Sequence, residues 1–246
     1  MATATFRIWR GGPDGGALQD YRTEVSEGMV VLDAVHRVQA EQATDLAVRW
    51  NCKAGKCGSC SAEINGHPKL MCMTRLNSLD LSAPVTVEPM KAFPPIRDLV
   101  TDVSWNYRVK KGIRPFAPRR PDAPDGTWRM AQPDVDRVQE FRKCIECFLC
   151  QDVCHILRDH HLHEGFIGPR FLLYNAALEM HPLDTGDRLE NLKERDGIGY
   201  CNITRCCTKV CPEHITITEN AIIPLKERVV DRFYDPLTRL LRVFKS

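Results

Sequence analysis

The chain has 246 residues, enough for two domains that each bury a core of their own. Its composition, 43% hydrophobic and 27% charged with a net charge of +2, is that of an ordinary globular protein and lacks the strong basic excess typical of nucleic-acid binders, so we expect no nucleic-acid partner. No apolar run reaches the roughly 18 residues of a membrane span, and the start lacks the apolar stretch of a signal peptide, so we expect a cytoplasmic chain.

Short strands around one helix are predicted near the start of the chain. Phe6 and Ile8 belong to a strand-like alternation, and the segment 29–42 places apolar residues at helical spacing. A second strand-like stretch covers residues 85–90. This mixture favours a small α+β domain at the N-terminus.

A proline-rich connection follows, in the stretches FPPIRDL and RPFAPRRPDAPDG, where regular structure is not expected to continue. We therefore predict one domain in residues 1–100 and a second in residues 101–246. Segments of the second half such as LLYNAALEM and AIIPLKERVVDRF have helical composition with few strand signals. The second domain is predicted to be all helical.

Twelve cysteines fall into three tight groups, which in a reducing compartment indicates metal binding or redox chemistry and not a disulfide framework. The first group has the C-x4-C-x2-C spacing of plant-type 2Fe-2S ferredoxins, with a distant fourth cysteine. Its predicted ligands are Cys52, Cys57, Cys60 and Cys72. Gly55 and Gly58 agree with this prediction, because a loop around a cluster needs permissive backbone angles. A zinc site is the alternative, although zinc motifs favour C-x2-4-C pairs.

The second and third groups resemble the two runs of bacterial two-cluster ferredoxins, in which the fourth cysteine of each run ligates the other cluster. One run holds Cys144, Cys147, Cys150 and Cys154 at C-x2-C-x2-C-x3-C. The other, CNITRCCTKVCP, has Thr204 where a second ligand is expected and an additional Cys206 two residues later. The third cysteine group is therefore one thiolate short.

Applying the crossed pairing predicts two different clusters. A 4Fe-4S cluster takes Cys144, Cys147, Cys150 and Cys211. A 3Fe-4S cluster takes Cys154, Cys201 and Cys207, because the Thr204 hydroxyl is a far poorer iron ligand than a thiolate. We interpret Cys206 as a small buried hydrophobe beside the ligands, with ligation as the alternative.

A plant-type 2Fe-2S domain followed by crossed 4Fe-4S and 3Fe-4S runs resembles the iron-sulfur subunits of succinate dehydrogenase and fumarate reductase. The resemblance covers nearly the whole chain and rests on CKAGKCGSC with Cys72, CIECFLCQDVC, FIGPR and CNITRCCTKVCP. It implies an α+β fold with an N-terminal plant-type ferredoxin (β-grasp) domain and a C-terminal, all-helical, bacterial-ferredoxin-like domain. It implies no catalytic acid or base on this chain.

The resemblance also implies partners. A flavoprotein subunit would oxidise succinate on FAD, and electrons would pass singly through the three clusters to quinone at a membrane anchor. The chain is then expected at the cytoplasmic face of the cell membrane, held by the anchor. The same subunit of a quinol:fumarate reductase is the closest alternative, and a structural zinc protein or a freestanding ferredoxin-like carrier are others. No G-x-G-x-x-G follows a strand, so no flavin site is expected here.

One stretch differs from the ubiquinone-reducing members, which carry Cys-Pro and a quinone-contacting tryptophan soon after the first 3Fe-4S ligand. This chain has CHILRDHHLHEG, and no tryptophan lies near it in the sequence. We therefore expect menaquinone, or a quinone site elsewhere with haem b in the anchor. The histidines of the stretch are interpreted as a solvated loop, with proton transfer or anchor contact as the alternative. They are His155, His160, His161 and His163.

Charged residues near the cysteines and charged residues at the C-terminus each allow two interpretations. Cations beside a cluster can raise its potential, or they can be plain surface charges. Those flanking the cysteine groups are Lys53, Lys56, Arg142, Lys143 and Lys209. The tail DPLTRLLRVFKS has a basic amphipathic pattern, which predicts either a terminal helix packed on its own domain or a contact with a membrane surface or subunit.

Overall fold

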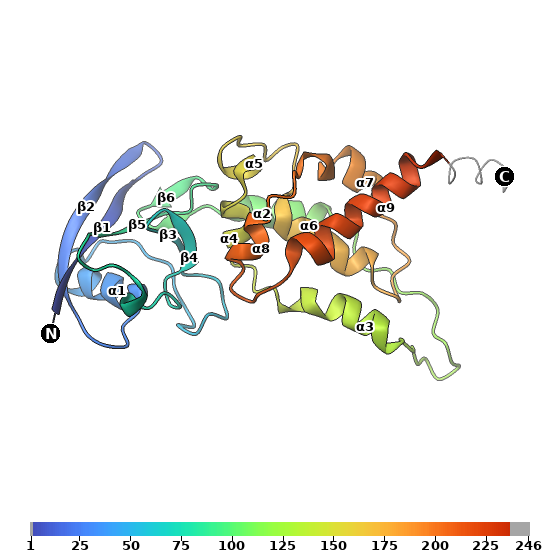
Figure 1. Cartoon of the computed structure of the whole chain (residues 1–246), viewed down its shortest axis with the longest axis horizontal. Helices are drawn as coiled ribbons and strands as arrows, with labels where there is room; N and C mark the ends of the chain where they lie inside the picture. The colour runs from blue at the N-terminus through green and yellow to red at the C-terminus, as the bar shows by residue number, and fades with distance from the viewer. Residues whose placement is uncertain (1, 237–246) are drawn as a thin grey trace.

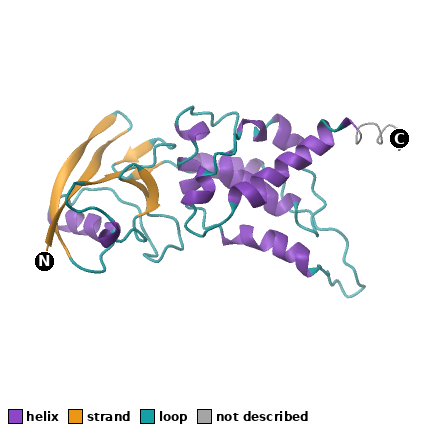
Figure 2. Ribbon diagram, in the orientation of Figure 1, coloured by secondary structure: helices purple, strands orange, loops and turns teal. Residues whose placement is uncertain are grey.

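An α+β domain and a helical domain lie end to end along the long axis of the molecule (Figure 1). The structure is a computed structural model and describes residues 2–236. The strands lie almost entirely in the first part of the chain and most helices in the second (Figure 2), which confirms the predicted fold class. The basic amphipathic pattern of the tail falls on residues 237–246, outside the described residues.

The first domain is built on a five-stranded sheet with strand order β2-β1-β5-β3-β4, in which β1 and β5 are parallel and the other neighbours antiparallel. The strands are β1 Ala2–Gly12, β2 Gly15–Val25, β3 Ser61–Ile64, β4 His67–Leu70 and β5 Val85–Glu88. Phe6 and Ile8 are fully buried on one face of β1, as period-two alternation predicts. The expected strand over residues 85–90 is β5, which ends two residues earlier.

One helix, α1 (Val31–Glu41), supplies much of the remaining core of this domain. Its buried residues Val31, Leu32, Val35 and Val38 recur at the spacing of a single helix face and belong to the same core cluster as Phe6. The loop that follows α1 carries Cys52, Cys57 and Cys60 and returns the chain to β3 at Ser61, whereas Cys72 follows β4. The cysteine loop is thus anchored at both ends by packed elements.

The proline-rich connection is partly regular, contrary to expectation. The FPPIRDL stretch contains β6 (Pro95–Arg97), which pairs with β7 (Val100–Thr101) directly after the stretch to form a two-stranded sheet. Pro95 is the first residue of its strand, a position where the missing amide hydrogen disturbs the ladder least. Residues 113–131 lie between helices α2 and α3 without a named strand or helix.

Helices dominate the second domain. They are α2 Ser104–Gly112, α3 Gln132–Gln139, α4 Leu149–Asp152, α5 His155–Arg158, α6 Gly168–Glu179, α7 Leu189–Glu194, α8 Cys206–Val210 and α9 Ile223–Phe233, with a π-helical segment at Ile217–Ile222 before α9. α6 is buried on nearly all sides, as expected for a central helix with apolar residues all round. Within residues 2–236, no helix is both long and apolar enough to cross a bilayer.

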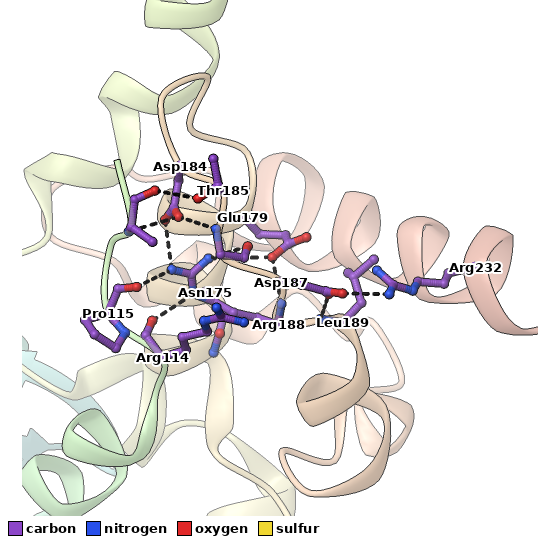
Figure 3. A network of polar contacts seen from close by, with 12 residues as sticks. Arg114, Pro115, Asn175, Glu179, Asp184, Thr185, Asp187, Arg188, Leu189 and Arg232 are labelled. Carbon is purple, nitrogen blue, oxygen red and sulfur yellow. Dashed lines mark hydrogen bonds and ion pairs between the residues drawn. The ribbon is translucent and has the colours of Figure 1, made fainter. Parts of the chain in front are cut away.

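A fully buried arginine, Arg188, ties the 113–131 segment to the loop before α7 (Figure 3). Its guanidinium donates to the carbonyl oxygens of Arg114 and Pro115, each at 2.8 Å, and to the Asp184 carboxylate at 2.8 Å. Its backbone amide donates to Glu179 at 3.1 Å. Burial raises the pKa of Glu179, while Arg188 opposes the rise.

The cores of the two domains interlock. Cys147 and Leu149 come from the helical half of the chain, yet they pack in the core of the sheet domain. Conversely, Met90, Ala92 and Phe93 follow β5 and pack in the helical core. The second cysteine group therefore starts inside the junction between the domains.

Candidate functional site

The first cysteine loop directs backbone amides at its own sulfur atoms. Cys52 Sγ accepts hydrogen bonds from the amides of Ala54 and Lys56, at 3.4 and 3.3 Å. The Cys72 amide donates to Cys60 Sγ at 3.5 Å, which joins the distant fourth cysteine to the loop. Such donors stabilise negatively charged sulfur, as a ligated thiolate requires.

Left-handed backbone angles give this loop its shape. Gly55 and Gly58 have φ of 66° and 68°, as the sequence led us to expect of a loop around a cluster. Burial alone would raise the pKa of Cys57, but hydrogen bonds from Ser59 and from backbone amides lower that pKa to about 6. Burial raises the pKa of Cys60 to about 12.

The second cysteine site is a cavity between the start of α6, the loop before α4 and the segment after α8. Four cysteines line it, and they are Cys144, Cys147, Cys150 and Cys211. Glu146 and Phe148 adopt left-handed φ of 55° and 61°, so the chain turns at alternate residues between the first three cysteines. The Ile215 amide donates to Cys211 Sγ at 3.5 Å. The fold therefore places around one cavity the same four cysteines that the crossed pairing predicted as ligands of one cluster.

A third site is lined by cysteines of both runs, namely Cys154, Cys201, Cys206 and Cys207. Thr204 also lines it, and its Oγ1 lies 3.3 Å from Cys206 Sγ. Cys206 is half-buried and lines the same cavity. The prediction of a buried hydrophobe is therefore wrong about its burial. Cys206 follows Thr204 by two residues, and both side chains line the same cavity.

The donor set fits iron-sulfur clusters. Thiolates are soft ligands that suit such clusters, and nearly all donors here are cysteine sulfur. Burial raises the pKa of Cys147 and of Cys154 to about 12 and that of Cys207 to about 11, so these thiols must release protons when metal is loaded. In the described part of the chain, no three histidine, cysteine or acidic side chains converge on a single metal ion. The thiols stand around cavities, which suits a cluster better than zinc.

The three sites adjoin one another. Gly58 of the first loop lies so close to the second site that an added Cβ would be 2.6 Å from Cys147 Cα. Ser61 Oγ donates to the Cys147 carbonyl at 2.9 Å, and Lys56 Nζ pairs with Glu213 at 3.0 Å. The second and third sites adjoin because α4 packs against α8. The second site is therefore adjacent to both of the others.

The histidine stretch divides between solvent and protein. His160 and His161 are exposed, whereas His155 and His163 are half-buried, so the solvated loop describes only part of the group. His155 lines the third site, with Nε2 at 3.1 Å from Asn202 Nδ2. Trp105 donates to the His163 carbonyl at 3.2 Å and packs edge-on against its ring. A tryptophan distant in sequence is therefore near this stretch in space, although none lines the third site itself.

Sequence reasoning assigned no role to Arg170, which lines the second site with 5% of its surface exposed. It belongs to the FIGPR motif and is the only charged residue of IGPRFLLYNAAL, a segment otherwise suited to a core helix. A lone cation at the start of a buried helix is the signal that could have revealed it. Among the cations that flank the cysteine groups in the sequence, Lys56 has a largely exposed side chain that pairs with Glu213.

Comparison with known proteins identifies both halves. Residues 5–107 match a family model described as a 2Fe-2S iron-sulfur cluster binding domain, and residues 140–215 match a 4Fe-4S dicluster domain. These matches confirm the predicted 2Fe-2S and 4Fe-4S cofactors and favour them over a structural zinc protein.

Relatives extend the likeness over nearly the whole chain. A fumarate reductase iron-sulfur subunit of Mycobacterium tuberculosis is 33% identical over 201 residues, 80% of each chain. A succinate dehydrogenase iron-sulfur subunit of Paracoccus denitrificans is 28% identical and covers 92% of this chain and 88% of its own. A chain of the solved Mycobacterium smegmatis Sdh1 complex in the apo form is 61% identical, with a TM-score of 0.92, and the match covers 96% of this chain and 98% of that one.

Proposed function

The chain belongs to the family of iron-sulfur subunits of succinate dehydrogenase and fumarate reductase, and on this premise we propose that it conducts single electrons from the FAD of a flavoprotein subunit to quinone at a membrane anchor. The observation that carries the proposal is the row of three adjoining cysteine sites, in which Gly58 of the first contacts Cys147 of the second. A zinc protein needs no such row. Electron transfer does, because successive carriers must lie close together.

We propose the following ligands. The 2Fe-2S cluster is held by Cys52, Cys57, Cys60 and Cys72. The 4Fe-4S cluster is held by Cys144, Cys147, Cys150 and Cys211, which line one cavity. The 3Fe-4S cluster is held by Cys154, Cys201 and Cys207, which line another. When bound, the clusters supply one-electron chemistry that amino-acid side chains lack.

The protein's own residues position and shield these sites. Backbone amides at Ala54, Lys56 and Ile215 donate to ligand sulfur and stabilise its negative charge. Burial of Cys147 and Cys150 excludes water from the second site. The close packing of α4 and α8 sets the separation of the second and third sites, so the order of transfer is built into the fold.

Exposed apolar side chains at both ends of the row support two different subunit contacts. At the first site, Trp50 and Met73 are 46% and 58% exposed, and Cys52 is exposed as well. We assign this end to the flavoprotein. At the third site, Tyr200 and Ile203 are 55% and 39% exposed, and we assign this end to the membrane anchor, which holds the chain at the cytoplasmic face of the membrane.

Succinate oxidation is the proposed direction, because the relative in the Sdh1 complex shares 61% of its residues with this chain. Fumarate reduction by the same subunit is the second candidate, favoured by the name of the Mycobacterium tuberculosis relative. Both directions use the same row of sites, so the direction rests with the partners and the quinone.

The quinone is proposed to be menaquinone, bound away from the third site with haem b in the anchor completing the transfer. Two observations support this proposal. Among residues 2–236 no tryptophan lines the third site, and Trp105, which does approach the CHILRDHHLHEG stretch, contacts His163 instead.

Purification of the intact complex from membranes tests the function. We expect a flavoprotein and an anchor to copurify, electron paramagnetic resonance to show three distinct clusters, and the complex to oxidise succinate faster than it reduces fumarate. Zinc in place of iron, or a stable monomer active without partners, would refute the proposal. Ubiquinone bound beside this subunit in a complex without haem would refute the quinone assignment alone.

A further inference from the structure

Arg170 is buried at the second cysteine site with one donor unused. It stands in the first turn of α6 and lines the cavity together with Cys144, Cys147, Cys150 and Cys211. Its Nη2 donates to Glu146 Oε1 at 2.6 Å, but its Nε is buried and has no hydrogen-bond partner among the described residues. A buried donor is costly to leave unpaired, so such a group calls for an acceptor that the protein atoms do not provide.

The surroundings hold this guanidinium in place. The Arg170 amide donates to Gln151 Oε1 at 3.2 Å, and the guanidinium lies 5.7 and 5.4 Å from the ring centres of Phe171 and Tyr174. Glu146 sits between the first two cysteines of its run and is fixed by a left-handed φ of 55°. Turning the Arg170 Nε toward solvent would break the ion pair with Glu146 and the two ring contacts.

The trio of Arg170, Glu146 and Lys110 carries a net positive charge. Glu146 also accepts from Lys110 Nζ at 2.6 Å, so one carboxylate faces two cations. One positive charge therefore remains, and Arg170 is the member of the trio that lines the cavity, with 7% of its side chain exposed against 37% for Lys110. Charges at buried positions are screened far less than charges in water.

The other deeply buried arginine of the described residues, Arg188, leaves no guanidinium nitrogen without a partner. Arg188 has each of its three guanidinium nitrogens hydrogen-bonded, to three carbonyl oxygens and to Asp184 (Figure 3). No cysteine is among its partners. The contrast favours an acceptor for the Arg170 Nε inside the cavity.

We propose that Arg170 raises the reduction potential of the second cluster, its Nε hydrogen donating to sulfur in the cavity and its charge favouring the reduced, more negative state. The inference rests on the proposed ligand assignment. The step it affects is the uptake of one electron from the first site and its release to the third. No bond forms or breaks at Arg170, which keeps its proton throughout. A cation and a donor beside a centre that gains negative charge both favour reduction.

Redox titration of the intact complex, followed by electron paramagnetic resonance, tests this proposal. We expect Arg170→Gln to lower the 4Fe-4S midpoint so that the ratio of oxidised to reduced centre rises about tenfold at the wild-type midpoint, which equals about 59 mV for one electron. Arg170→Lys retains the charge without Nε and should give a smaller shift. The 2Fe-2S and 3Fe-4S midpoints should stay within error of wild type.

Two further variants guard against a merely structural effect. Lys110→Met removes the other cation of Glu146 without touching the cavity wall and should shift the midpoint less than Arg170→Gln. Glu146→Gln removes the anion instead and should shift it upward. If Arg170→Gln loses the cluster, Arg170→Lys and Glu146→Gln still test the proposal, because the first should lower the 4Fe-4S midpoint and the second should raise it.

An unchanged midpoint in Arg170→Gln, or equal shifts in Arg170→Gln and Lys110→Met, would overturn the role of Arg170. Absence of any 4Fe-4S signal from the wild-type complex would instead contradict the proposed function. The two failures are therefore distinguishable.

Discussion

Arg158 on α5 forms a bidentate ion pair with Glu63 on β3, across the border between the two domains. The Glu63 side chain is completely buried, while that of Arg158 is 20% exposed. Lys91 approaches the same carboxylate at 3.3 Å. A buried carboxylate needs such partners, because leaving it without a counter-charge costs far more than the pair itself gains. This ion pair therefore holds the 2Fe-2S domain against the helices that carry the other cysteines.

Replacing Arg158 by methionine is expected to destabilise the domain junction by about 3–5 kcal/mol, toward the lower end because Lys91 remains. The reason is that Glu63 would stay buried with only one cation. Chemical unfolding of the cluster-loaded protein, followed by tryptophan fluorescence, measures the loss.

The matched control is Arg7→Met, which breaks the bidentate pair with Asp20 on the surface of the sheet, where the side chains are 42% and 49% exposed. Exposed pairs contribute about 0.2–1 kcal/mol. Equal losses of stability in the two variants would show that the Arg158–Glu63 pair contributes no more than an exposed ion pair.

Gly58→Ala should separate the first two cysteine sites. Gly58 has φ of 68°, and an added Cβ would lie 2.6 Å from Cys147 Cα and 2.8 Å from Cys147 Cβ. Since neither backbone can yield without shifting a ligand, we expect slower reduction of the 4Fe-4S centre by succinate, measured by freeze-quench paramagnetic resonance.

Gly66→Ala controls for backbone strain alone. Gly66 has φ of 74° but nothing within 4 Å of an added Cβ, so only the cost of a left-handed residue, about 1–2 kcal/mol, applies. Electron transfer in this variant should match wild type. The same kinetic defect in both variants would mean that strain, and not the contact with Cys147, is responsible.

Thr204→Cys is expected to complete the third site. Thr204 lines the cavity and occupies the second ligand position of its run, so a cysteine there offers the missing thiolate. The oxidised 3Fe-4S signal in electron paramagnetic resonance should give way to a 4Fe-4S centre of lower potential. Thr204→Ser should keep the original signal, and persistence of that signal in Thr204→Cys would contradict the ligand register.

Cys206→Ala tests the remaining cysteine. Its sulfur lies 3.3 Å from Thr204 Oγ1 but breaks the spacing that Cys207 keeps. We expect the 3Fe-4S signal to survive with unchanged intensity, measured by spin quantification against wild type. Loss of the signal in this variant would make Cys206 a ligand.

Glu179 is expected to make stability depend on pH. Burial raises its pKa above the usual 4.5, although Arg188 opposes the rise. A carboxyl with a raised pKa holds its proton more tightly in the folded state, so it favours folding at low pH, and this contribution is lost as pH rises from about 4.5 through the folded pKa.

Thermal unfolding from about pH 5 to about pH 8 checks this expectation. Over that range, wild type should lose stability relative to Glu179→Gln, which cannot ionise but still accepts from the Arg188 amide. Two parallel pH profiles would show that Glu179 titrates alike in the folded and unfolded states.

The sequence by itself predicted the chemistry of the sites, because cysteine spacing is characteristic of the ligands of iron-sulfur clusters. The C-x4-C-x2-C loop and the two runs of the second half predicted the cofactors, and the crossed pairing grouped the four cysteines that line the second cavity. Local periodicity likewise predicted the strand at Phe6 and a helix within residues 29–42, observed as α1, since a single buried face repeats along each.

Only the tertiary structure decided which groups outside the cysteine runs reach the sites. Trp105 meets His163 across 58 positions of sequence, Arg158 meets Glu63 across 95, and Arg170 reaches the second cavity from a different helix. Such contacts depend on how the two domains pack, and no spacing encodes them. The same packing places Gly58 against Cys147, which is why three separate cysteine motifs become one continuous row.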